Sequence, residues 1–310
     1  MAKGRTARHS HLHRRIRDWY ARNRRELQWR TTTDPYEILV SEVMLQQTQV
    51  SRVKEKLPLF LKAFPNVRAL ARASNAEVLR AWAGMGYNNR AVRLRELART
   101  VIERHRGTVP ARAEDLLRLP GIGPYTAHAL LCFAFGERVP VVDVNIRRVF
   151  SRVFWKMSDL SSAVAEKEAW TLAAKILPRD AYTWNQALMD LGATVCTARR
   201  PLCSECPVRS ACASAAALER ARSAKRMPRE RTEPSYQGIP QRIWRGRAVA
   251  ELRNVRAASS LRLEELGRRL KPDFHDGEAG WLLSVIAALA KDGIVETRTR
   301  SSATLVRLAS

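Results

Sequence analysis

Four of the five cysteines stand close together in "CTARRPLCSECPVRSAC", residues 196–212, in the pattern C-x6-C-x2-C-x5-C. Thiolates this near in sequence can close around one metal centre with little loss of loop entropy. Four thiolates suit either zinc or an iron–sulfur cluster. Zinc sites usually pair two Cys-x2-Cys turns, and this segment has one, so the uneven spacing favours a [4Fe–4S] cluster. The predicted ligands are Cys196, Cys203, Cys206 and Cys212.

The fifth cysteine, Cys132 in "ALLCFAFG", is expected to be buried and free. Five cysteines in this arrangement do not resemble the disulfide framework of a secreted protein. No apolar run approaches the roughly 20 residues of a membrane span, and the first 15 residues lack the apolar core of a signal peptide. We therefore expect a cytoplasmic protein that does not bind membranes.

Two acids lie in unusual surroundings. Glu42, in "SEVMLQQTQV", falls between Ile38 and Leu39 in helical projection, so its carboxyl points into an apolar region. Desolvation disfavours the ionised form of such a carboxyl, which is what a general acid needs at neutral pH. The alternative is that Glu42 caps a neighbouring helix. Asp143, in "VPVVDVNIRRV", stands just ahead of a helical pattern, where an aspartate is typical of an N-cap.

Two Gly-x-Gly pairs occur in similar settings. "LRAWAGMGYNNRA" and "LLRLPGIGPYTAHA" both place an apolar helix before the glycines and a tyrosine with a second helix after them. Glycines permit a tight turn whose amides, with those of the next helix start, point outward together and can hold a phosphate. Residues 119–127 therefore have the form of a helix–hairpin–helix; the alternative is an ordinary turn between two helices.

The charge balance also indicates a polyanionic partner. Lysine and arginine number 55 against 30 acids, a net charge of +25. Such a surplus suits nucleic acid or an anionic membrane, and arginine in particular suits phosphate. The alternative is a solvated basic surface or the arginine bias of a high-GC genome.

These residues must be positioned by helices for most of the chain. Residues 12–217 read as consecutive amphipathic helices with short links and no alternating strand pattern, so we predict an all-α domain. A basic N-terminal arm, residues 1–11, precedes it, and a basic linker, residues 218–238, follows. Residues 239–310 contain three helical patterns and a terminal strand–turn–strand, which is typical of a small α+β, winged-helix-like domain.

These motifs together resemble a known family. The hairpin motif, an aspartate about twenty residues after it and the closing C-x6-C-x2-C-x5-C are similar to the endonuclease III superfamily of DNA glycosylases. Within it, "WRTTTDPYEILVSEVMLQQTQVSRV" and "GMGYNNRA" resemble the adenine glycosylases that act on adenine opposite 8-oxoguanine or guanine. The similarity runs from about Trp19 to Cys212, two thirds of the chain. It implies a mainly α, two-lobed helix–hairpin–helix fold with DNA in the cleft between the lobes and a structural [4Fe–4S] cluster.

The resemblance also implies the catalytic roles. Glu42 would protonate adenine N7, and Asp143 would stabilise or bond the positively charged C1′ of the sugar. Asn145 would orient water or that carboxylate. Relatives that also cut the strand carry a lysine where this chain has Tyr125, and a phenol cannot form an imine, so we expect base release without lyase activity. The catalytic candidates are Glu42, Asp143, Tyr125 and Asn145.

An enzyme that extracts a base must fill the gap it leaves. The resemblance implies that Gln47 enters the duplex and that Tyr87, with Met85, wedges on the estranged-base side. The alternatives are that Gln47 caps a helix and Tyr87 belongs to a core. Arg30 is expected to contact the active-site helix or a phosphate. The candidate DNA-binding residues are Arg30, Gln47, Thr48, Met85, Tyr87, Gly121 and Gly123.

The sequence departs from the adenine-type pattern in two places. Asn88 stands where the family usually has a second aromatic residue. The last 75 or so residues are shorter than the nucleotide-hydrolase-like domain that reads 8-oxoguanine, and that domain's strand pattern is missing. Two rival functions stay open: a thymine or uracil mismatch glycosylase, and a non-catalytic iron–sulfur or winged-helix DNA-binding protein. The expected partner is double-stranded DNA with a mismatch or lesion, bound by a monomer.

Overall fold

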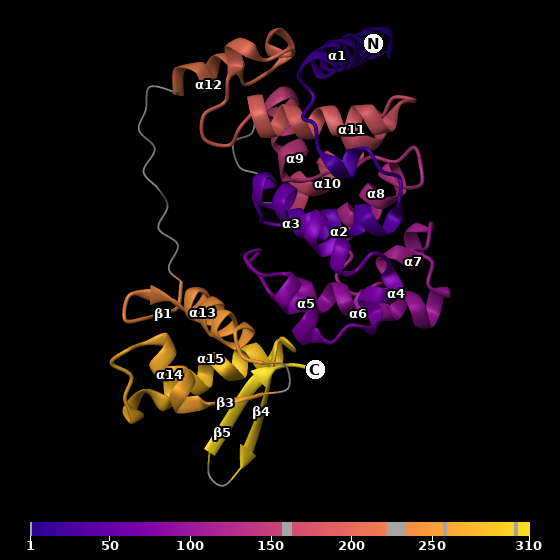
Figure 1. The fold of residues 1–310 in the computed structure, drawn as a ribbon. Helices are drawn as coiled ribbons and strands as arrows, with labels where there is room; N and C mark the ends of the chain where they lie inside the picture. Colours follow the sequence, from indigo (N-terminus) through magenta and orange to yellow (C-terminus); the bar gives the residue numbers. More distant parts are fainter. Residues whose placement is uncertain (1, 157–162, 222–232, 257–258, 301–302) are drawn as a thin grey trace. The chain divides into compact units, whose positions relative to one another are not determined.

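The computed structural model describes residues 2–156, 163–221, 233–256, 259–300 and 303–310, without the side chains of residues 2–8, 163–165 and 221. The fold is mainly α-helical, as expected (Figure 1). The chain forms two compact units, which are described separately. The first contains Met1–Ile38, Ala111–Leu117 and Ile122–Pro228, and the second contains Leu39–Pro110, Arg118–Gly121 and Arg229–Ser310.

The first unit is a helical layer built around α11. Its helices are α1 (Ala2–Asn23), α7 (Ala113–Leu117), α8 (Pro124–Phe133), α9 (Val144–Phe150), α10 (Ala163–Lys175), α11 (Ala181–Asp190) and α12 (Ala215–Ala221). Helix α1 packs on α11, where the ring of His13 meets the edge of Trp184 at 4.5 Å between ring centres. Helix α1 begins at Ala2, and the predicted basic arm at residues 1–11 stays a prediction.

Helix starts in this unit follow local rules. Pro124 occupies the first turn of α8, where its missing N–H costs nothing. The Asp180 side chain caps α11 by accepting a hydrogen bond from the Thr183 amide at 3.0 Å. At the start of α2 (Pro35–Leu45), which carries the chain from the first unit into the second, Asp34 accepts from the Tyr36 amide at 2.7 Å.

The second unit begins with a group of helices from the middle of the chain. After α2 come α3 (Val50–Ala63), α4 (Val67–Arg72), α5 (Asn75–Ala81) and α6 (Asn89–His105). Their shared core contains Phe60, Leu79 and Trp82, all fully buried. None of the described helices has both the length and the apolar character that crossing a bilayer requires.

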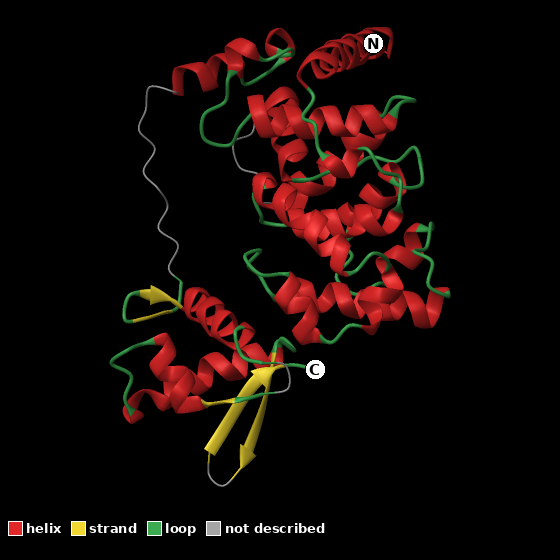
Figure 2. Ribbon diagram, in the orientation of Figure 1, coloured by secondary structure: helices red, strands yellow, loops and turns green. Residues whose placement is uncertain are grey.

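The rest of the second unit contains the strands that occur among the described residues (Figure 2). A hairpin of β1 (Ser235–Tyr236) and β2 (Ile239–Pro240) precedes α13 (Gln241–Arg253), β3 (Leu261–Arg262), α14 (Leu263–Leu270), α15 (Ala279–Lys291), β4 (Val295–Arg300) and β5 (Ala303–Leu308). The last three strands form an antiparallel sheet in the order β3-β5-β4. Trp244, Leu266 and Ile286 fill the core between the helices and this sheet.

This C-terminal part matches the sequence expectation in its main elements. The three helices and the terminal β-hairpin are present, whereas β3 and the β1–β2 hairpin were not expected. The winged-helix classification itself stays a prediction. Of the predicted linker, residues 218–221 belong to α12 and residues 235–236 to β1, and residues 222–232 lie outside the described residues.

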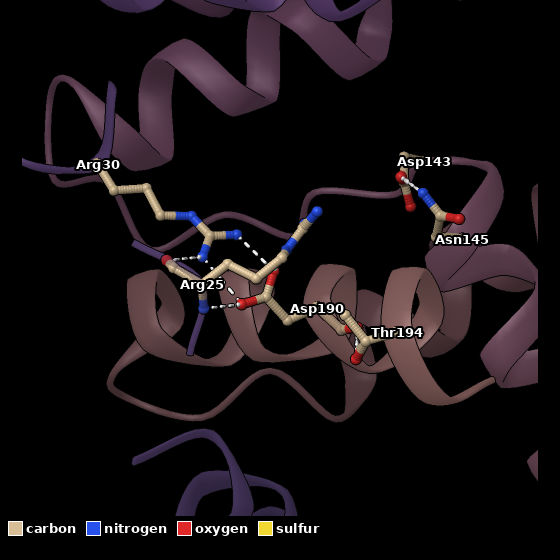
Figure 3. A network of polar contacts seen from close by, with 6 residues as sticks. All are labelled: Arg25, Arg30, Asp143, Asn145, Asp190 and Thr194. Atoms are coloured by element: carbon tan, nitrogen blue, oxygen red, sulfur yellow. Dashed lines mark hydrogen bonds and ion pairs between the residues drawn. The ribbon is translucent and has the colours of Figure 1, made fainter. Parts of the chain in front are cut away.

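A buried ion pair holds the N-terminal segment to α11. Asp190 is fully buried, and its carboxylate accepts from Arg30 at 2.8 and 2.9 Å and from the side chain and amide of Arg25 at 2.7 and 3.0 Å (Figure 3). Burial alone acts to raise the pKa of Asp190. The hydrogen bonds and charges of Arg30 and Arg25 outweigh that effect and hold the pKa below its usual range.

Asp190→Asn should lower the free energy of unfolding at pH 7 by about 3–5 kcal/mol, because it leaves the Arg30 charge buried without its partner. Since the folded pKa is depressed, the stabilisation is complete above the unfolded value of about 3.9 and is lost as the pH falls through the folded pKa. Urea unfolding of the wild type and variant across pH should therefore give curves that converge at acid pH. Glu265→Gln, which breaks the exposed pair with Arg269, is the control and should change stability by less than about 0.5 kcal/mol. A difference that stays constant with pH would contradict the assignment.

Candidate active site and cysteine loop

Glu42 lies in the middle of α2 with its side chain buried. Only 5% of the residue is exposed, and the neighbouring Ile38, Leu39 and Val43 are also buried. The predicted burial of Glu42 beside apolar residues of its own helix is thus confirmed.

Asp143 and Asn145 form the second acidic site, at the start of α9 (Figure 3). The Asp143 carboxylate caps the helix by accepting from the Ile146 amide at 2.7 Å, and its other oxygen accepts from Asn145 Nδ2 at 2.6 Å. Burial raises the pKa of Asp143, and these two hydrogen bonds oppose the rise. The N-cap prediction is confirmed, and Asn145 does orient the carboxylate.

A residue that the sequence analysis missed, Arg148, fixes Asn145 in turn. Its Nη2 donates to Asn145 Oδ1 at 2.8 Å and to the Gly192 carbonyl at 2.6 Å, and its Nε donates to the Cys196 carbonyl at 2.8 Å. A Cβ on Gly192 would lie 2.7 Å from the Cβ of Asn145, so α9 can approach this turn only because residue 192 is glycine. The acidic site is therefore hydrogen-bonded to the segment that begins the cysteine loop.

The four clustered cysteines line one cavity, together with apolar residues such as Val195 and Leu202. Among the described residues, no three histidine, cysteine or acidic side chains are close enough to hold a single metal ion. Thiolates that line one cavity can hold either a zinc ion or an iron–sulfur cluster. Arg152 approaches the Cys196 sulfur at 3.4 Å and places positive charge beside the loop.

Cys132 stands apart from this loop, as expected. It is buried and forms no disulfide, and its sulfur accepts from Asn185 Nδ2 at 3.3 Å. Burial raises the pKa of this thiol to about 11, so it is protonated and unreactive at neutral pH.

Two turns of the second unit carry the candidate duplex-probing residues. Gln47 follows the end of α2 and Tyr87 precedes α6, and both adopt left-handed backbone angles, φ +55° and φ +46°. Tyr87 is 55% exposed, which excludes the alternative that it belongs to a core. Met85 is only 3% exposed, so the prediction that it wedges beside Tyr87 is wrong: its side chain is part of the core beneath the turn.

The guanidinium of Arg90 is hydrogen-bonded to both of these turns. One nitrogen donates to the carbonyls of Val43, Met44 and Gln46 at 2.8, 3.0 and 2.5 Å. The other donates to Thr48 Oγ1 at 2.9 Å and to the carbonyls of Met85 and Gly86 at 3.2 and 3.3 Å. Burial lowers the pKa of Arg90 to about 10, which leaves it charged at neutral pH.

The remaining candidates are placed as follows. Arg30 forms an ion pair with the buried Asp190, and a contact of Arg30 with the active-site helix or a phosphate stays a prediction. Thr48 is held by Arg90 inside its turn. Gly121 is exposed and left-handed at φ +79°, and Gly123 precedes α8 as its N-cap, so the hairpin has the predicted turn. Tyr125 is half-buried in the first turn of α8.

Comparison with known proteins agrees with this arrangement. Residues 40–175 match the HhH-GPD superfamily of base excision DNA repair proteins, and residues 196–212 match the iron–sulfur binding domain of endonuclease III. A thymine-DNA glycosylase from Aeropyrum pernix is 36% identical over 206 residues, which cover 65% of this chain and 92% of that protein. The chain belongs to the HhH-GPD superfamily.

Other relatives of this HhH-GPD protein are adenine DNA glycosylases. The protein from Mycobacterium tuberculosis H37Rv is 45% identical over 192 residues, covering 61% of this chain and 63% of the relative. The Homo sapiens protein is 45% identical over 204 residues, covering 63% of this chain and 37% of the relative. The chain therefore matches less than two thirds of the length of these relatives.

Solved structures show the same fold. A thermostable thymine-DNA glycosylase superposes with a TM-score of 0.64 at 31% identity, over 68% of this chain and 98% of that one. Endonuclease III in a non-covalent DNA complex gives a TM-score of 0.58 at 22% identity, over 66% and 94%. The cysteine loop, residues 196–212, is a [4Fe–4S] binding domain by its match to that of endonuclease III. Cys196, Cys203, Cys206 and Cys212 as the four ligands stay a prediction.

Arg90→Met should loosen both turns at once, because each relies on the same guanidinium for its buried carbonyls. Hydrogen exchange read by mass spectrometry should show faster exchange of backbone amides in residues 46–49 and 85–89, by about 10-fold or more. Arg90→Lys should not restore protection, because a single ammonium cannot reach both sets of acceptors. Arg99→Met, an exposed arginine of the same helix, is the control. Faster exchange in one turn alone would show that Arg90 does not join them.

Proposed function

We propose that this protein is a DNA N-glycosylase that hydrolyses the N-glycosidic bond of adenine mispaired with 8-oxoguanine or guanine in double-stranded DNA. The observation that carries the proposal is the pair of fixed acids: Glu42 buried within α2, and Asp143 held by Asn145 at the start of α9. The 45% identity to adenine DNA glycosylases supports adenine as the base, and the net charge of +25 suits a polyanion.

The chemistry divides between the two acids. Glu42 donates its proton to N7 of the flipped adenine, so that the base leaves neutral when the N9–C1′ bond breaks and its electrons go to the base. The sugar becomes an oxocarbenium ion, and the Asp143 carboxylate stabilises the charge at C1′. Water then adds to C1′, and its released proton restores the acid form of Glu42. A capping aspartate suits this role because the helix start and Asn145 fix its oxygens.

The two turns joined by Arg90 supply the duplex contacts. In the proposal Gln47, exposed on its turn, fills the space left by the flipped base, and the Tyr87 ring stacks beside the estranged one. The amides around Gly121 and Gly123 hold a backbone phosphate. The [4Fe–4S] cluster supplies structural order to the loop of residues 196–212, and this chain's own residues carry every step of base release.

A second candidate is a thymine or uracil mismatch glycosylase. The Aeropyrum pernix thymine-DNA glycosylase, matched over 92% of its length, favours this reading. In that case Glu42 would hydrogen-bond a pyrimidine edge, since thymine has no N7. A panel of labelled duplexes with one mismatch each, incubated with the protein and then treated with alkali, separates the two candidates.

Glu42→Gln and Asp143→Asn should each reduce single-turnover release of adenine by at least about 10²-fold, because general acid help alone contributes ~10²–10⁴ in rate. Both variants should bind the duplex within a few-fold of the wild type, since neither residue is needed to hold phosphates. Glu166→Gln, at an exposed acid of α10, is the matched control. A wild-type rate of adenine release for Glu42→Gln would mean that the acid lies elsewhere.

The protein should release the base without cutting the strand, because Tyr125 has no amine to form a Schiff base with C1′. Borohydride added during turnover should trap no covalent protein–DNA adduct. Alkali treatment of a parallel sample shows that abasic product was formed and serves as the control. Efficient trapping would reveal an amine nucleophile at another position.

A further inference from the structure

The C-terminal part of the second unit is hydrogen-bonded to the turn that carries Tyr87. Arg253, the last residue of α13, donates from Nη2 to Asn88 Oδ1 at 2.7 Å and from Nε to the Leu79 carbonyl at 2.9 Å. In the opposite direction, Arg80 donates to the Val255 carbonyl at 3.3 Å. Helix α13 packs on α5 at this place.

The Asn88 side chain accepts this hydrogen bond and does not cap α6. It is the N-cap residue of α6, where an asparagine side chain normally accepts from one of the first free amides of the helix. Its backbone is instead helical, at φ −57° and ψ −25°, and its side chain forms no capping bond. The side-chain carbonyl oxygen of Asn88 therefore accepts from Arg253 and not from an amide of α6. A side chain without an acceptor at this position could not form the bond.

The bond fixes the residue next to Tyr87. Tyr87 is left-handed at φ +46°, a conformation that side chains other than glycine adopt at a cost. Arg90 holds the carbonyls of Met85 and Gly86 on one side of it, and Trp82 Nε1 donates to the Gly86 carbonyl at 3.1 Å. Arg253 holds Asn88 on the other side. The turn is thus restrained at both ends, from two different parts of the chain.

We propose that Arg253 is a positioning residue for Tyr87, and that the C-terminal part of the chain, residues 233–310, acts as a clamp that presets the Tyr87 turn for the base opposite the lesion. The proposal deepens the proposed function and rests on it for the role of Tyr87. A preset turn loses less conformational entropy when DNA binds, so the effect belongs to lesion recognition and not to phosphate binding in general.

The test compares Arg253→Met, which keeps most of the side-chain stem, with Arg256→Met, an exposed arginine just beyond α13. Affinity is measured by fluorescence anisotropy on two duplexes of equal length, one with a tetrahydrofuran abasic analogue opposite guanine and one fully paired. Arg253→Met should weaken binding to the abasic-analogue duplex by about 10-fold, the equivalent of ~1.4 kcal/mol, and to the paired duplex by less than about 3-fold. Equal losses on both duplexes would overturn the proposal.

A second measurement needs neither DNA nor activity. Hydrogen exchange of residues 85–89 should accelerate in Arg253→Met and in Asn88→Leu, which removes the acceptor. Asn88→Asp keeps the acceptor and adds a charge partner for Arg253, so protection should be retained. Unchanged exchange in Asn88→Leu would overturn the proposal even if Arg253→Met folds poorly.

These measurements separate the two levels of inference. If the wild type releases neither adenine nor a pyrimidine from any duplex, the proposed function fails, and the exchange experiment still decides whether Arg253 restrains the turn. If base release is found but Asn88→Leu and Asn88→Asp both exchange at the wild-type rate, the proposed function stands and the clamp is wrong.

Discussion

The two turns that carry Gln47 and Tyr87 in the second unit are both held by one buried cation, Arg90. Arg90 collects carbonyl oxygens from the end of α2 and from the turn before α6, segments that are about forty residues apart in the sequence. Carbonyls at a helix end and in a tight turn lack partners within their own element, and burying them unpaired costs about 1–3 kcal/mol each. A guanidinium with donors in a fixed plane satisfies both groups together. The positions of Gln47 and Tyr87 are consequently not independent of each other.

Buried arginines also connect separate segments in the first unit. Arg148 joins the Asn145 side chain to the carbonyls of Gly192 and Cys196, and Arg30 with Arg25 neutralises the buried Asp190. Part of the arginine content therefore serves the interior, and the net charge of +25 does not arise wholly from a DNA-facing surface. The net charge therefore overstates the number of arginines that are available to a polyanionic partner.

Local signals in the sequence predicted what local physics decides. The N-cap at Asp143 and the burial of Glu42 each depend on residues within a few positions, and both are found as expected. Arg90, Arg148 and Asp190 could not be found in this way, because each of them also has partners 42 to 165 residues away. The family resemblance suggested that Met85 contacts DNA and that Arg30 contacts the active-site helix or a phosphate, whereas Met85 is buried and Arg30 pairs with Asp190.

The left-handed residues connect this packing to recognition. Gln47 and Tyr87 each adopt a backbone that costs about 1–2 kcal/mol for a side chain other than glycine. Such a backbone persists where the surroundings hold the turn in place. Arg90 supplies that constraint for both turns, and Asn88 with Arg253 adds a second one for Tyr87. Tyr87, on the turn that is held from both sides, is 55% exposed. Because these hydrogen bonds hold the backbone of each turn, the exposed side chains of Gln47 and Tyr87 can contact a partner without rearrangement of the turn.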